Sequence, residues 1–420
     1  IRGCVPKKLL VYGSRYNREI EDARGYGWTC KGLRFDWPTL IYNVRREVDR
    51  LNGLYTRTLE AAGMDRFLTR AVVKSPHTVL LADREKPITS KVILVATGAH
   101  PAMPDVPGHQ HLISSNECFQ LEALPESIAI IGAGYIGMEF ASIFAGLGVA
   151  VTVLYRGDQV LRGFDDDLRD GLADAMRNLG VDLRMDTNVA SIEKEKDSYR
   201  VNLKEGGSIS AALVMGATGR VPRTAGLGLQ QIGVELGWNG QVVVDAFSKS
   251  SVDSIYAVGD VTDRANLTPA AIREANAFVE TVFQDRPTPI DYTFVPTAVF
   301  SEPEIGTVGL TEAKARAMYN NIDIYKSSFR PLRATVSGRN ERMLMKLVID
   351  GATDKVLGCH ILGPDAAEIV QMAAVPLMLG VTKAQLDATM ALHPSVAEEL
   401  VTMRHKWEHP APIKGSDAAA

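Results

Sequence analysis

The sequence is poor in cysteine and has no long hydrophobic run. Only 4 of its 420 residues are cysteines. That is too few for a disulfide scaffold and indicates an intracellular chain with mostly free thiols. No apolar stretch approaches the roughly 18 to 20 residues that a membrane-spanning helix needs. We therefore expect a cytoplasmic location and no membrane partner.

The sequence also lacks a strong excess of one charge. Its formal net charge is −4 and its isoelectric point is about 6.1, so no strong positive field draws it to nucleic acid or anionic lipid. Hydrophobic residues make up 46% and charged residues 23%, which excludes disordered and fibrous classes. The chain begins at Ile1 rather than Met. We therefore expect a fragment or a processed form, from which a targeting signal could already be missing.

Short β-branched runs alternate with longer amphipathic stretches, which is typical of α/β proteins with parallel sheets. Helices are expected at residues 9–23, 37–63, 135–146 and 268–283. Strands are expected at residues 91–95, 127–131, 150–155, 181–185, 199–203, 212–215 and 254–258. After a linker with Pro287 and Pro289, residues 345–349, 355–361, 365–378 and 396–407 are expected to form a mixture of strands and helices.

A glycine motif follows the apolar run at residues 127–131. Gly132, Gly134 and Gly137 have the spacing G-x-G-x-x-G between an expected strand and an expected helix. In dinucleotide-binding proteins these glycines allow a tight turn, close approach to a pyrophosphate and close packing of helix on strand. A purely structural glycine turn is the alternative. The strand and helix on either side favour a dinucleotide site.

The end of the next strand indicates which nucleotide is bound. An NAD site usually carries an acidic residue there, but this strand ends in Arg156, and Arg162 follows. Two guanidinium groups suit a 2′-phosphate, although Asp158 lies between them. They could instead be two solvated loop arginines. We interpret the pattern as NADP(H) binding.

Two further residues suggest thiol chemistry. Cys4 directly precedes an expected helix and has Lys7 nearby, and a helix N-terminus with lysines favours the thiolate. His393 has Glu398 five residues later, an arrangement that can hold one histidine tautomer and supply protons. Taken alone, the cysteine could be a passive small residue and the histidine a structural one.

Four motifs in this order resemble the flavoprotein disulfide reductases, and most closely the glutathione reductase branch. They are R-G-C-V-P-K-K at residues 2–8, G-A-G-Y-I-G-M-E at 132–139, Y-A-V-G-D at 256–260 followed by L-T-P-A-A-I at 267–272, and H-P-S-V-A-E-E at 393–399. The similarity extends over essentially the whole chain. The resemblance implies NADPH-dependent reduction of glutathione disulfide through FAD and a cysteine pair.

The resemblance also implies the domain organisation. It predicts an α/β fold with two Rossmann-like domains, which bind FAD and NADP, and an α+β C-terminal dimerisation domain. The expected bounds are an FAD-binding domain at 1–123, incomplete at its N-terminus, an NADP-binding domain at 124–246, the remainder of the central domain at 247–291, and an interface domain at 292–420. In the family signature C-x-x-x-x-C, Cys4 matches the second, flavin-facing cysteine. The first is expected two residues before Ile1, outside the sequence.

By the same resemblance, individual residues receive roles. The expected FAD contacts are Thr97, Gly98, Asp260, Leu267 and Thr268. The expected NADP(H) contacts, besides the glycine motif and the two arginines, are Tyr135, Gly219 and Arg220. Lys7 and Glu139 match an ion pair near the flavin, and Tyr135 matches a tyrosine that covers the nicotinamide pocket. His393, oriented by Glu398, is expected to reach the partner's cysteine pair in an obligate homodimer.

The substrate inference is weaker. Tyr55 resembles a tyrosine near the glutathione site, but the position of a family arginine holds Asn276, and Arg273 lies one turn earlier on the same expected helix. Cys30, Cys118 and Cys359 match no family redox position, and their spacing forms no metal signature. Dihydrolipoamide dehydrogenase, mercuric reductase and soluble transhydrogenase types, and an inactive NADP-binding dimeric fragment, stay open as alternatives.

Overall fold

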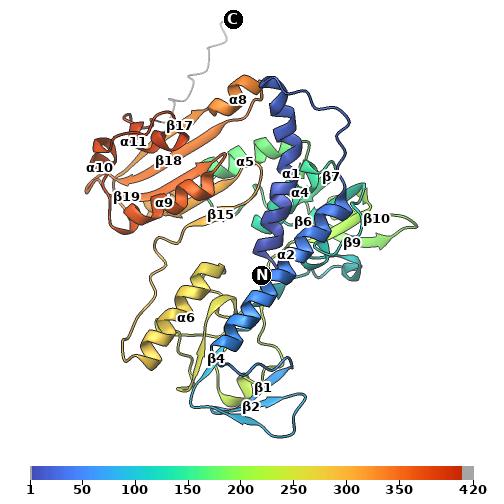
Figure 1. Cartoon of the computed structure of the whole chain (residues 1–420), viewed down its shortest axis with the longest axis vertical. Helices are drawn as coiled ribbons and strands as arrows, with labels where there is room; N and C mark the ends of the chain where they lie inside the picture. Colours follow the sequence, from blue (N-terminus) through green and yellow to red (C-terminus); the bar gives the residue numbers. More distant parts are fainter. Residues whose placement is uncertain (1, 409–420) are drawn as a thin grey trace, which may run out of the picture. The chain divides into compact units, whose positions relative to one another are not determined.

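The computed structural model describes residues 2–408 of the chain (Figure 1). Ile1 of the expected FAD-binding domain and residues 409–420 of the expected interface domain lie outside the described residues. Contacts divide the chain into two compact units. Unit 1 comprises Ile1–Ser14, Arg34–Asp158 and Gly180–Tyr292, and unit 2 comprises Arg15–Leu33, Gln159–Leu179 and Thr293–Ala420.

A parallel sheet in unit 1 carries the glycine motif. Its strand order is β12-β6-β7-β8. The bounds are β6 (Ser127–Ile131), β7 (Ala150–Leu154), β8 (Asp182–Arg184) and β12 (Leu213–Gly216). Helix α4 (Tyr135–Gly146) connects β6 to β7. Four of the five residues of β6 are buried, as expected for a central strand covered on both faces. The motif Gly132–Gly137 therefore starts at the carboxyl end of a buried strand.

Unit 1 contains four smaller sheets among its described residues. They are β1 (Ala71–Ser75), β2 (Thr78–Leu81) and β3 (Ile88–Thr89); β9 (Val189–Lys194), β10 (Tyr199–Leu203) and β11 (Ser208–Ala211); β5 (Ala99–Pro101) with β13 (Arg220–Pro222); and β4 (Ile93–Val95) with β14 (Ile255–Ala257). The β4–β14 pair is parallel. Because parallel strands end at the same edge, it brings Thr97 and Asp260 to one end of the sheet.

The first helix begins earlier than the sequence predicts. Helix α1 (Cys4–Gly25) starts at the cysteine itself rather than at Leu9. Pro6 is tolerated in the first turn because an N–H group there has no intrahelical acceptor, and the Lys7 N–H donates to the Gly3 carbonyl at 3.2 Å. The other helices of unit 1 are α2 (Trp37–Ala61), α3 (Ser115–Cys118) and α6 (Thr268–Phe283), with short 3-10 turns η1 (His109–His111), η2 (Gln230–Ile232) and η3 (Gly259–Thr262).

Unit 2 is built on a five-stranded antiparallel sheet in the order β15-β16-β19-β18-β17. The strands are β15 (Thr297–Val299), β16 (Ile305–Gly309), β17 (Ile322–Phe329), β18 (Met343–Asp350) and β19 (Val356–Leu362). The helices are α5 (Asp166–Asn178), α7 (Glu312–Met318), α8 (Leu332–Ser337), α9 (Ala366–Met378), α10 (Lys383–Ala388) and α11 (Glu399–Thr402), preceded by η4 (Val396–Glu398). Regular structure in the last expected segment therefore ends at Thr402 rather than Trp407. Among residues 2–408, no helix is long and apolar enough to cross a membrane.

Helix α9 packs very closely on the sheet of unit 2. Val370, Ala374 and Leu377 are buried in its core. A Cβ atom added to Gly306 of β16 would lie 2.3 Å from the Ala366 carbonyl oxygen and 2.8 Å from a Val370 methyl carbon. Only glycine fits this approach without a shift of the backbone.

We predict that Gly306→Ala lowers the free energy of unfolding by about 1 to 3 kcal/mol, because the added methyl group overpacks the contact between β16 and α9. Urea denaturation measures the change. The control is Gly53→Ala inside α2, where the nearest atom is the flexible end of Arg57 at 3.4 Å; it should stabilise by up to about 1 kcal/mol. Equal behaviour of the two variants would contradict the prediction.

Candidate active site

The three glycines of the motif differ in what surrounds them. Gly132 has φ 116°, and a Cβ atom there would lie 2.3 Å from the Ala217 carbonyl oxygen. At Gly137 it would lie 2.1 Å from the Gly132 carbonyl oxygen, whereas at Gly134 it would meet nothing within 4 Å. At the first and third positions, only glycine leaves room for the neighbouring backbone of the turn and the helix. The second leaves open space at the N-terminus of α4, which suits a pyrophosphate.

Cys4 lies at the N-terminus of α1, close to the N-terminus of another helix. Its Sγ atom is 3.8 Å from Thr268 Oγ1, the first residue of α6. Lys7, one turn later on α1, donates from Nζ to Glu139 Oε1 of α4 at 2.7 Å. Both side chains of this pair are largely buried, and it joins the thiol-bearing helix to the helix of the glycine motif. The exposed thiol is accessible to a reaction partner.

Tyr135 brings the nucleotide motif and the thiol region together. It is the first residue of α4, and its ring is partly exposed. Burial raises the pKa of its hydroxyl, and the negative charges of Glu139, Asp260 and Cys4 act in the same direction. These groups come from three separate segments of unit 1, namely α4, η3 and α1. The phenol therefore stays protonated between the glycine turn and the thiol.

Asp260 lies directly after β14, in the 3-10 turn η3. Its Oδ2 atom is 3.7 Å from Arg220 Nε, too far for a hydrogen bond. Burial raises its pKa above the usual aspartate range, although Arg220 opposes this. Arg220 itself donates from Nη2 to the Ala99 carbonyl at 2.7 Å. A half-buried carboxylate with acceptor capacity to spare suits a ligand hydroxyl.

The sequence reasoning missed Glu274, which supports Asp260. Its side chain is fully buried on α6. It accepts hydrogen bonds from the Gly259 N–H and the Tyr292 hydroxyl, both at 2.6 Å, and lies 3.1 Å from Arg264. The carboxylate thus holds the turn that presents Asp260. The only local signal was an acidic residue among the buried positions Ala270, Ala277 and Phe278 of an amphipathic helix.

The remaining expected FAD contacts surround the ends of β4 and α6. Thr97 donates from Oγ1 to the Arg223 carbonyl at 2.8 Å, and the Gly98 carbonyl accepts from the Arg223 N–H at 2.8 Å. Leu267 is the N-cap of α6, and its N–H donates to the Ala265 carbonyl at 2.8 Å. Thr268 opens the helix, where N–H groups lack intrahelical acceptors.

These features fit the two dinucleotides. Gly134 offers room for a phosphate, and Asp260 offers a hydroxyl acceptor at the carboxyl end of a parallel strand. A cavity of about 710 Å³ in unit 1 lies beside the Thr97–Gly98 turn and has a lining of mixed charge, which includes Arg2, Arg45, Arg223, Asp49 and Glu117. The residues present therefore fit FAD and NADP(H).

Other expected contacts lie apart from this cluster or belong to the other unit. Arg156 is exposed after β7 in unit 1, and Arg162 is exposed in unit 2, just before α5. Gly219 has φ 132° and precedes β13. Tyr55 on α2 and Arg273 on α6 are both exposed, and so is Asn276. No hydrogen bond joins Tyr55 to Arg273 among the described residues.

His393 and Glu398 meet within unit 2. His393 Nδ1 lies 3.1 Å from Glu398 Oε1 and 3.2 Å from Oε2. A carboxylate only accepts, so Nδ1–H donates and Nε2 is left to exchange protons with a reaction partner. The His393 side chain is 80% exposed. It lines a cavity of about 640 Å³ together with Arg15, Arg18 and Glu302.

The other cysteines lie in different surroundings. Cys118 and Cys359 are buried, and Cys30 is partly buried. Burial raises the pKa of Cys118 strongly and that of Cys359 to about 12, so both stay thiols at neutral pH and are poor nucleophiles. Within residues 2–408, no group of three or more His, Cys, Asp or Glu side chains could hold a metal ion.

The fold and the site define a nucleotide-dependent thiol–disulfide oxidoreductase. Comparison with known families agrees with this. Residues 1–275 match the pyridine nucleotide-disulphide oxidoreductase family, and residues 295–404 match the dimerisation domain of the same family. The chain belongs to the pyridine nucleotide-disulphide oxidoreductases.

Individual relatives are similar over nearly the whole chain. A glutathione reductase of Burkholderia cepacia is 48% identical over 97% of this chain and 90% of its own length. A chloroplastic/mitochondrial glutathione reductase of Pisum sativum is 45% identical over 96% of this chain and 73% of its own length. The solved HOCl-induced flavoprotein disulfide reductase RclA from Escherichia coli is 26% identical, with a TM-score of 0.84 over 95% of this chain and 88% of that one.

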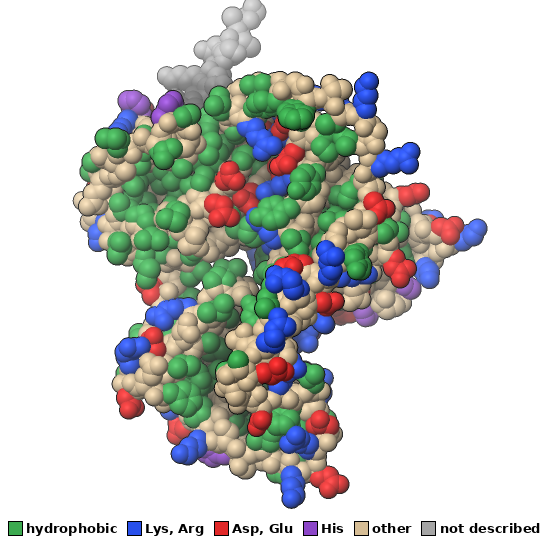
Figure 2. All heavy atoms as spheres, viewed as in Figure 1, with side chains coloured by type: hydrophobic (Ala, Val, Ile, Leu, Met, Phe, Trp, Pro, Cys, Tyr) green, Lys and Arg blue, Asp and Glu red, His purple; other side chains and the backbone are tan. Residues whose placement is uncertain are grey.

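The dimerisation domain has an uncovered apolar surface. On the side of α9 away from the core, Met372, Val375, Met378 and the following Leu379 are between 53% and 82% exposed. Figure 2 shows hydrophobic side chains gathered at the upper left, where Figure 1 draws α9. A helix that is apolar on both faces is normally buried on both, and such a patch marks an association surface. We interpret this face of α9 as part of the homodimer interface.

We predict that Met378→Glu converts the dimer to monomers at micromolar concentration, because a charge would be buried against the partner's apolar surface. Sedimentation velocity or size-exclusion chromatography with light scattering measures the mass. Met318→Glu on α7 is the matched control, since Met318 is 67% exposed in the same unit and should leave the dimer intact. A dimer that persists in Met378→Glu would place the interface elsewhere.

Proposed function

We propose that the protein reduces glutathione disulfide to glutathione with NADPH, using FAD and a redox-active cysteine pair. The observation that carries the proposal is the 44–48% identity to three glutathione reductases over nearly the whole chain. Trypanothione reductases of Leishmania donovani and Trypanosoma congolense are also similar, at 39% and 37% identity. The lower identity makes their substrate the less favoured assignment.

Each cofactor has a set of candidate residues in the chain. Thr97, Gly98, Asp260, Leu267 and Thr268 hold FAD, and the glycine motif with Tyr135, Arg156, Arg162, Gly219 and Arg220 holds NADP(H). Bound FAD supplies two-electron transfer between the nicotinamide and the cysteine pair. The open space at Gly134 and the spare acceptor of Asp260 support these assignments.

The chain supplies the thiol and its electrostatic setting. Cys4 is the cysteine that faces FAD, and it lies exposed in the first turn of α1. Lys7 places a cation one turn away, where it stabilises negative charge during reduction, and Glu139 fixes its position. The first cysteine of the pair is proposed to lie five residues before Cys4, outside the sequence.

Disulfide reduction then proceeds by two exchanges. The thiolate of the first cysteine attacks one sulfur of glutathione disulfide, which forms a mixed disulfide and releases one glutathione thiolate. The Cys4 thiolate attacks the enzyme sulfur of the mixed disulfide, which restores the Cys pair disulfide and releases the second thiolate. His393, held by Glu398, protonates the leaving thiolates. Tyr55 and Arg273 are proposed to contact the substrate.

The protein is a homodimer, as its dimerisation domain indicates. We assign the FAD-binding domain to 1–123, the NADP-binding domain to 124–246, the rest of the central domain to 247–291 and the interface domain to 292–420. The exposed position of His393 supports a role at the partner's cysteine pair. A cytoplasmic location is supported by four cysteines that form no disulfide.

The experiment that tests the activity compares disulfides with the purified chain. Flavin absorption, NADPH binding and NADPH oxidation are measured with glutathione disulfide, trypanothione disulfide and lipoamide. We expect glutathione disulfide to be preferred. Turnover mainly with lipoamide would favour a dihydrolipoamide dehydrogenase type. A colourless, folded chain that binds NADPH without turnover would favour the non-catalytic dimeric alternative.

We predict that Arg156→Glu weakens NADPH binding by roughly tenfold to a hundredfold, because it removes a charge-assisted contact to the 2′-phosphate and adds repulsion. NADH, which lacks that phosphate, should be affected less than threefold by the same estimate. Dissociation constants for both nucleotides come from fluorescence titration. Arg200→Glu on β10, another exposed arginine of unit 1, is the control and should change neither. Equal losses for NADPH and NADH would refute the 2′-phosphate assignment.

We predict that Glu398→Gln lowers kcat for glutathione disulfide by about tenfold to a hundredfold, because the amide holds the imidazole and its cation less well. Bleaching of the flavin absorption by NADPH alone should be unchanged, since His393 acts only on leaving thiolates. The neighbouring Glu399→Gln is the control, because Glu399 bonds to Thr402 instead. A parallel loss in the NADPH half-reaction would show that Glu398 acts through stability rather than proton transfer.

A further inference from the structure

A row of polar side chains crosses the sheet of unit 2. Lys326 of β17 is paired with Lys346 of β18, Lys346 with His360 of β19, and His360 with Thr307 of β16. Side chains of directly paired residues lie on the same face of a sheet. Four neighbouring strands thus present a continuous polar line, where the core of a sheet normally presents apolar residues.

Lys346 is the centre of this line. Its side chain is 2% exposed, and Nζ contacts three carboxylates: Asp165 Oδ1 at 2.8 Å, Asp167 Oδ2 at 2.6 Å and Glu312 Oε2 at 2.7 Å. Burial alone would lower its pKa, but these carboxylates raise it above the usual lysine range. Lys326 adds a second cation, with Nζ 2.8 Å from Asp167 Oδ1. The ammonium group is therefore charged and fully coordinated.

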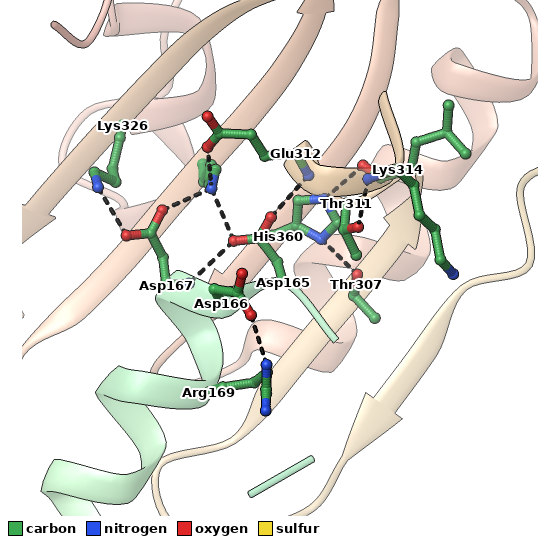
Figure 3. Close-up of polar contacts among 12 residues, drawn as sticks. Asp165, Asp166, Asp167, Arg169, Thr307, Thr311, Glu312, Lys314, Lys326 and His360 are labelled. Atoms are coloured by element: carbon green, nitrogen blue, oxygen red, sulfur yellow. Dashed lines mark hydrogen bonds and ion pairs between the residues drawn. The ribbon is translucent and has the colours of Figure 1, made fainter. Parts of the chain in front are cut away.

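The carboxylates connect this cluster to the start of α5. Asp165 is the N-cap of α5 and accepts from the Asp167 N–H at 3.2 Å. Its other oxygen accepts from the Glu312 N–H at 3.0 Å. As Figure 3 shows, Asp165, Asp166 and Asp167 come from one helical end and two of them point to the sheet. The first turn of α5 is thus tied to β18 and α7.

The loop just before Asp165 has a constrained backbone conformation and contains Arg162. Val160 and Leu161 are fully buried, and Leu161 has φ 51°, which is costly for a branched side chain. Arg169 of α5 donates from Nε to the Val160 carbonyl at 2.8 Å. Gln159 donates from Nε2 to Asp170 Oδ1 at 2.8 Å. Contacts with α5 therefore fix the loop Gln159–Phe164, while the Arg162 side chain is exposed.

We propose that Lys346 is a positioning residue for nucleotide selectivity: by holding the N-terminus of α5, it keeps the Gln159–Phe164 loop in the conformation that presents Arg162 to the 2′-phosphate. The inference rests on the proposed contact of Arg162 with NADP(H). Strain at Leu161 persists only where surrounding contacts enforce it. When Lys346 is lost, three carboxylates repel one another at the helix end, and the loop relaxes away from its strained conformation.

The test measures binding of adenosine 2′,5′-bisphosphate and of 5′-AMP to the purified full chain by isothermal titration calorimetry. The two ligands differ only by the 2′-phosphate, and neither requires bound FAD or turnover. Lys346→Met should weaken the bisphosphate about tenfold and 5′-AMP less than twofold, since only the charge-assisted phosphate contact is lost. Lys346→Arg, which keeps the cation, should recover most of the loss.

The matched control is Lys383→Met. Lys383 is also 2% exposed in unit 2, where it pairs with Asp387 and donates to the Met403 carbonyl at 2.7 Å, but it has no contact with α5 or its loop. The Lys383→Met variant should be less stable, but the ratio of its affinities for adenosine 2′,5′-bisphosphate and 5′-AMP should not change. If Lys346→Met weakens both ligands equally, or neither, the positioning role is wrong.

Two further variants keep the result interpretable. If Lys346→Met does not fold, Asp167→Asn replaces it, because Asp167 is 30% exposed and receives both lysines; it should weaken the bisphosphate selectively, and an unchanged ratio overturns the inference. Arg162→Ala tests the proposed function separately. Loss of selectivity in Arg162→Ala but not in the Lys346 and Asp167 variants refutes only the positioning role. No loss in Arg162→Ala refutes the phosphate contact itself.

Discussion

The ion pair between Lys7 and Glu139 is the interaction on which the arrangement of unit 1 depends. Glu139 is nearly inaccessible to solvent, and a carboxylate buried in that way is costly unless a cation reaches it. Lys7 of α1 reaches it, with Nζ 2.7 Å from Glu139 Oε1. Satisfying this carboxylate therefore fixes the first turn of α1 beside α4. The consequence is chemical as well as structural, because Cys4 lies one turn before Lys7 and Tyr135 one turn before Glu139.

The same rule organises the other polar centres. Glu274 is fully buried and is matched by Arg264, the Tyr292 hydroxyl and the Gly259 N–H, so the turn before Asp260 has one conformation. In unit 2, Lys346 is matched by three carboxylates. Buried ionic groups add little net stability compared with apolar packing, but removing one partner is strongly unfavourable. In this protein, each buried ionic group is satisfied in only one arrangement of the segments that it joins, so it fixes that arrangement.

The sequence alone predicted the elements whose signal is local. The apolar run before Gly132, the glycine spacing and the apolar periodicity of residues 268–283 placed β6, α4 and α6 at the bounds that the structure shows. The expected start of the first helix at residue 9 was wrong, because α1 begins at Cys4 and includes Pro6, which is compatible with a first helical turn. Helix α5 was missed: it is rich in aspartate and arginine, and its apolar face is short.

Local and non-local signals also separate the site residues that the sequence predicted from those that it missed. Residues within motifs, such as Cys4 and Lys7, could be named from spacing and family resemblance. Glu274 and Lys346 could not, because their partners lie elsewhere in the chain; Lys346 is 181 residues from Asp165. A single sequence contains no information on such pairs beyond a charged residue at a position whose neighbours are apolar. That signal is present at Lys346, which lies between the apolar residues Met345 and Leu347.

The residues proposed for the chemistry are divided between the two units. Unit 1 holds the thiol, the Lys7 cation and most of the residues proposed for the two dinucleotides, whereas Arg162 and the His393–Glu398 pair belong to unit 2. The imidazole is 80% exposed, and Nδ1 is committed to Glu398. An imidazole with so much accessible surface, on the same unit as the uncovered apolar face of α9, fits the proposed role of a proton donor at an association surface. If a partner subunit covers the imidazole, it removes water from around the ring, which strengthens the interaction of the imidazolium with a developing thiolate.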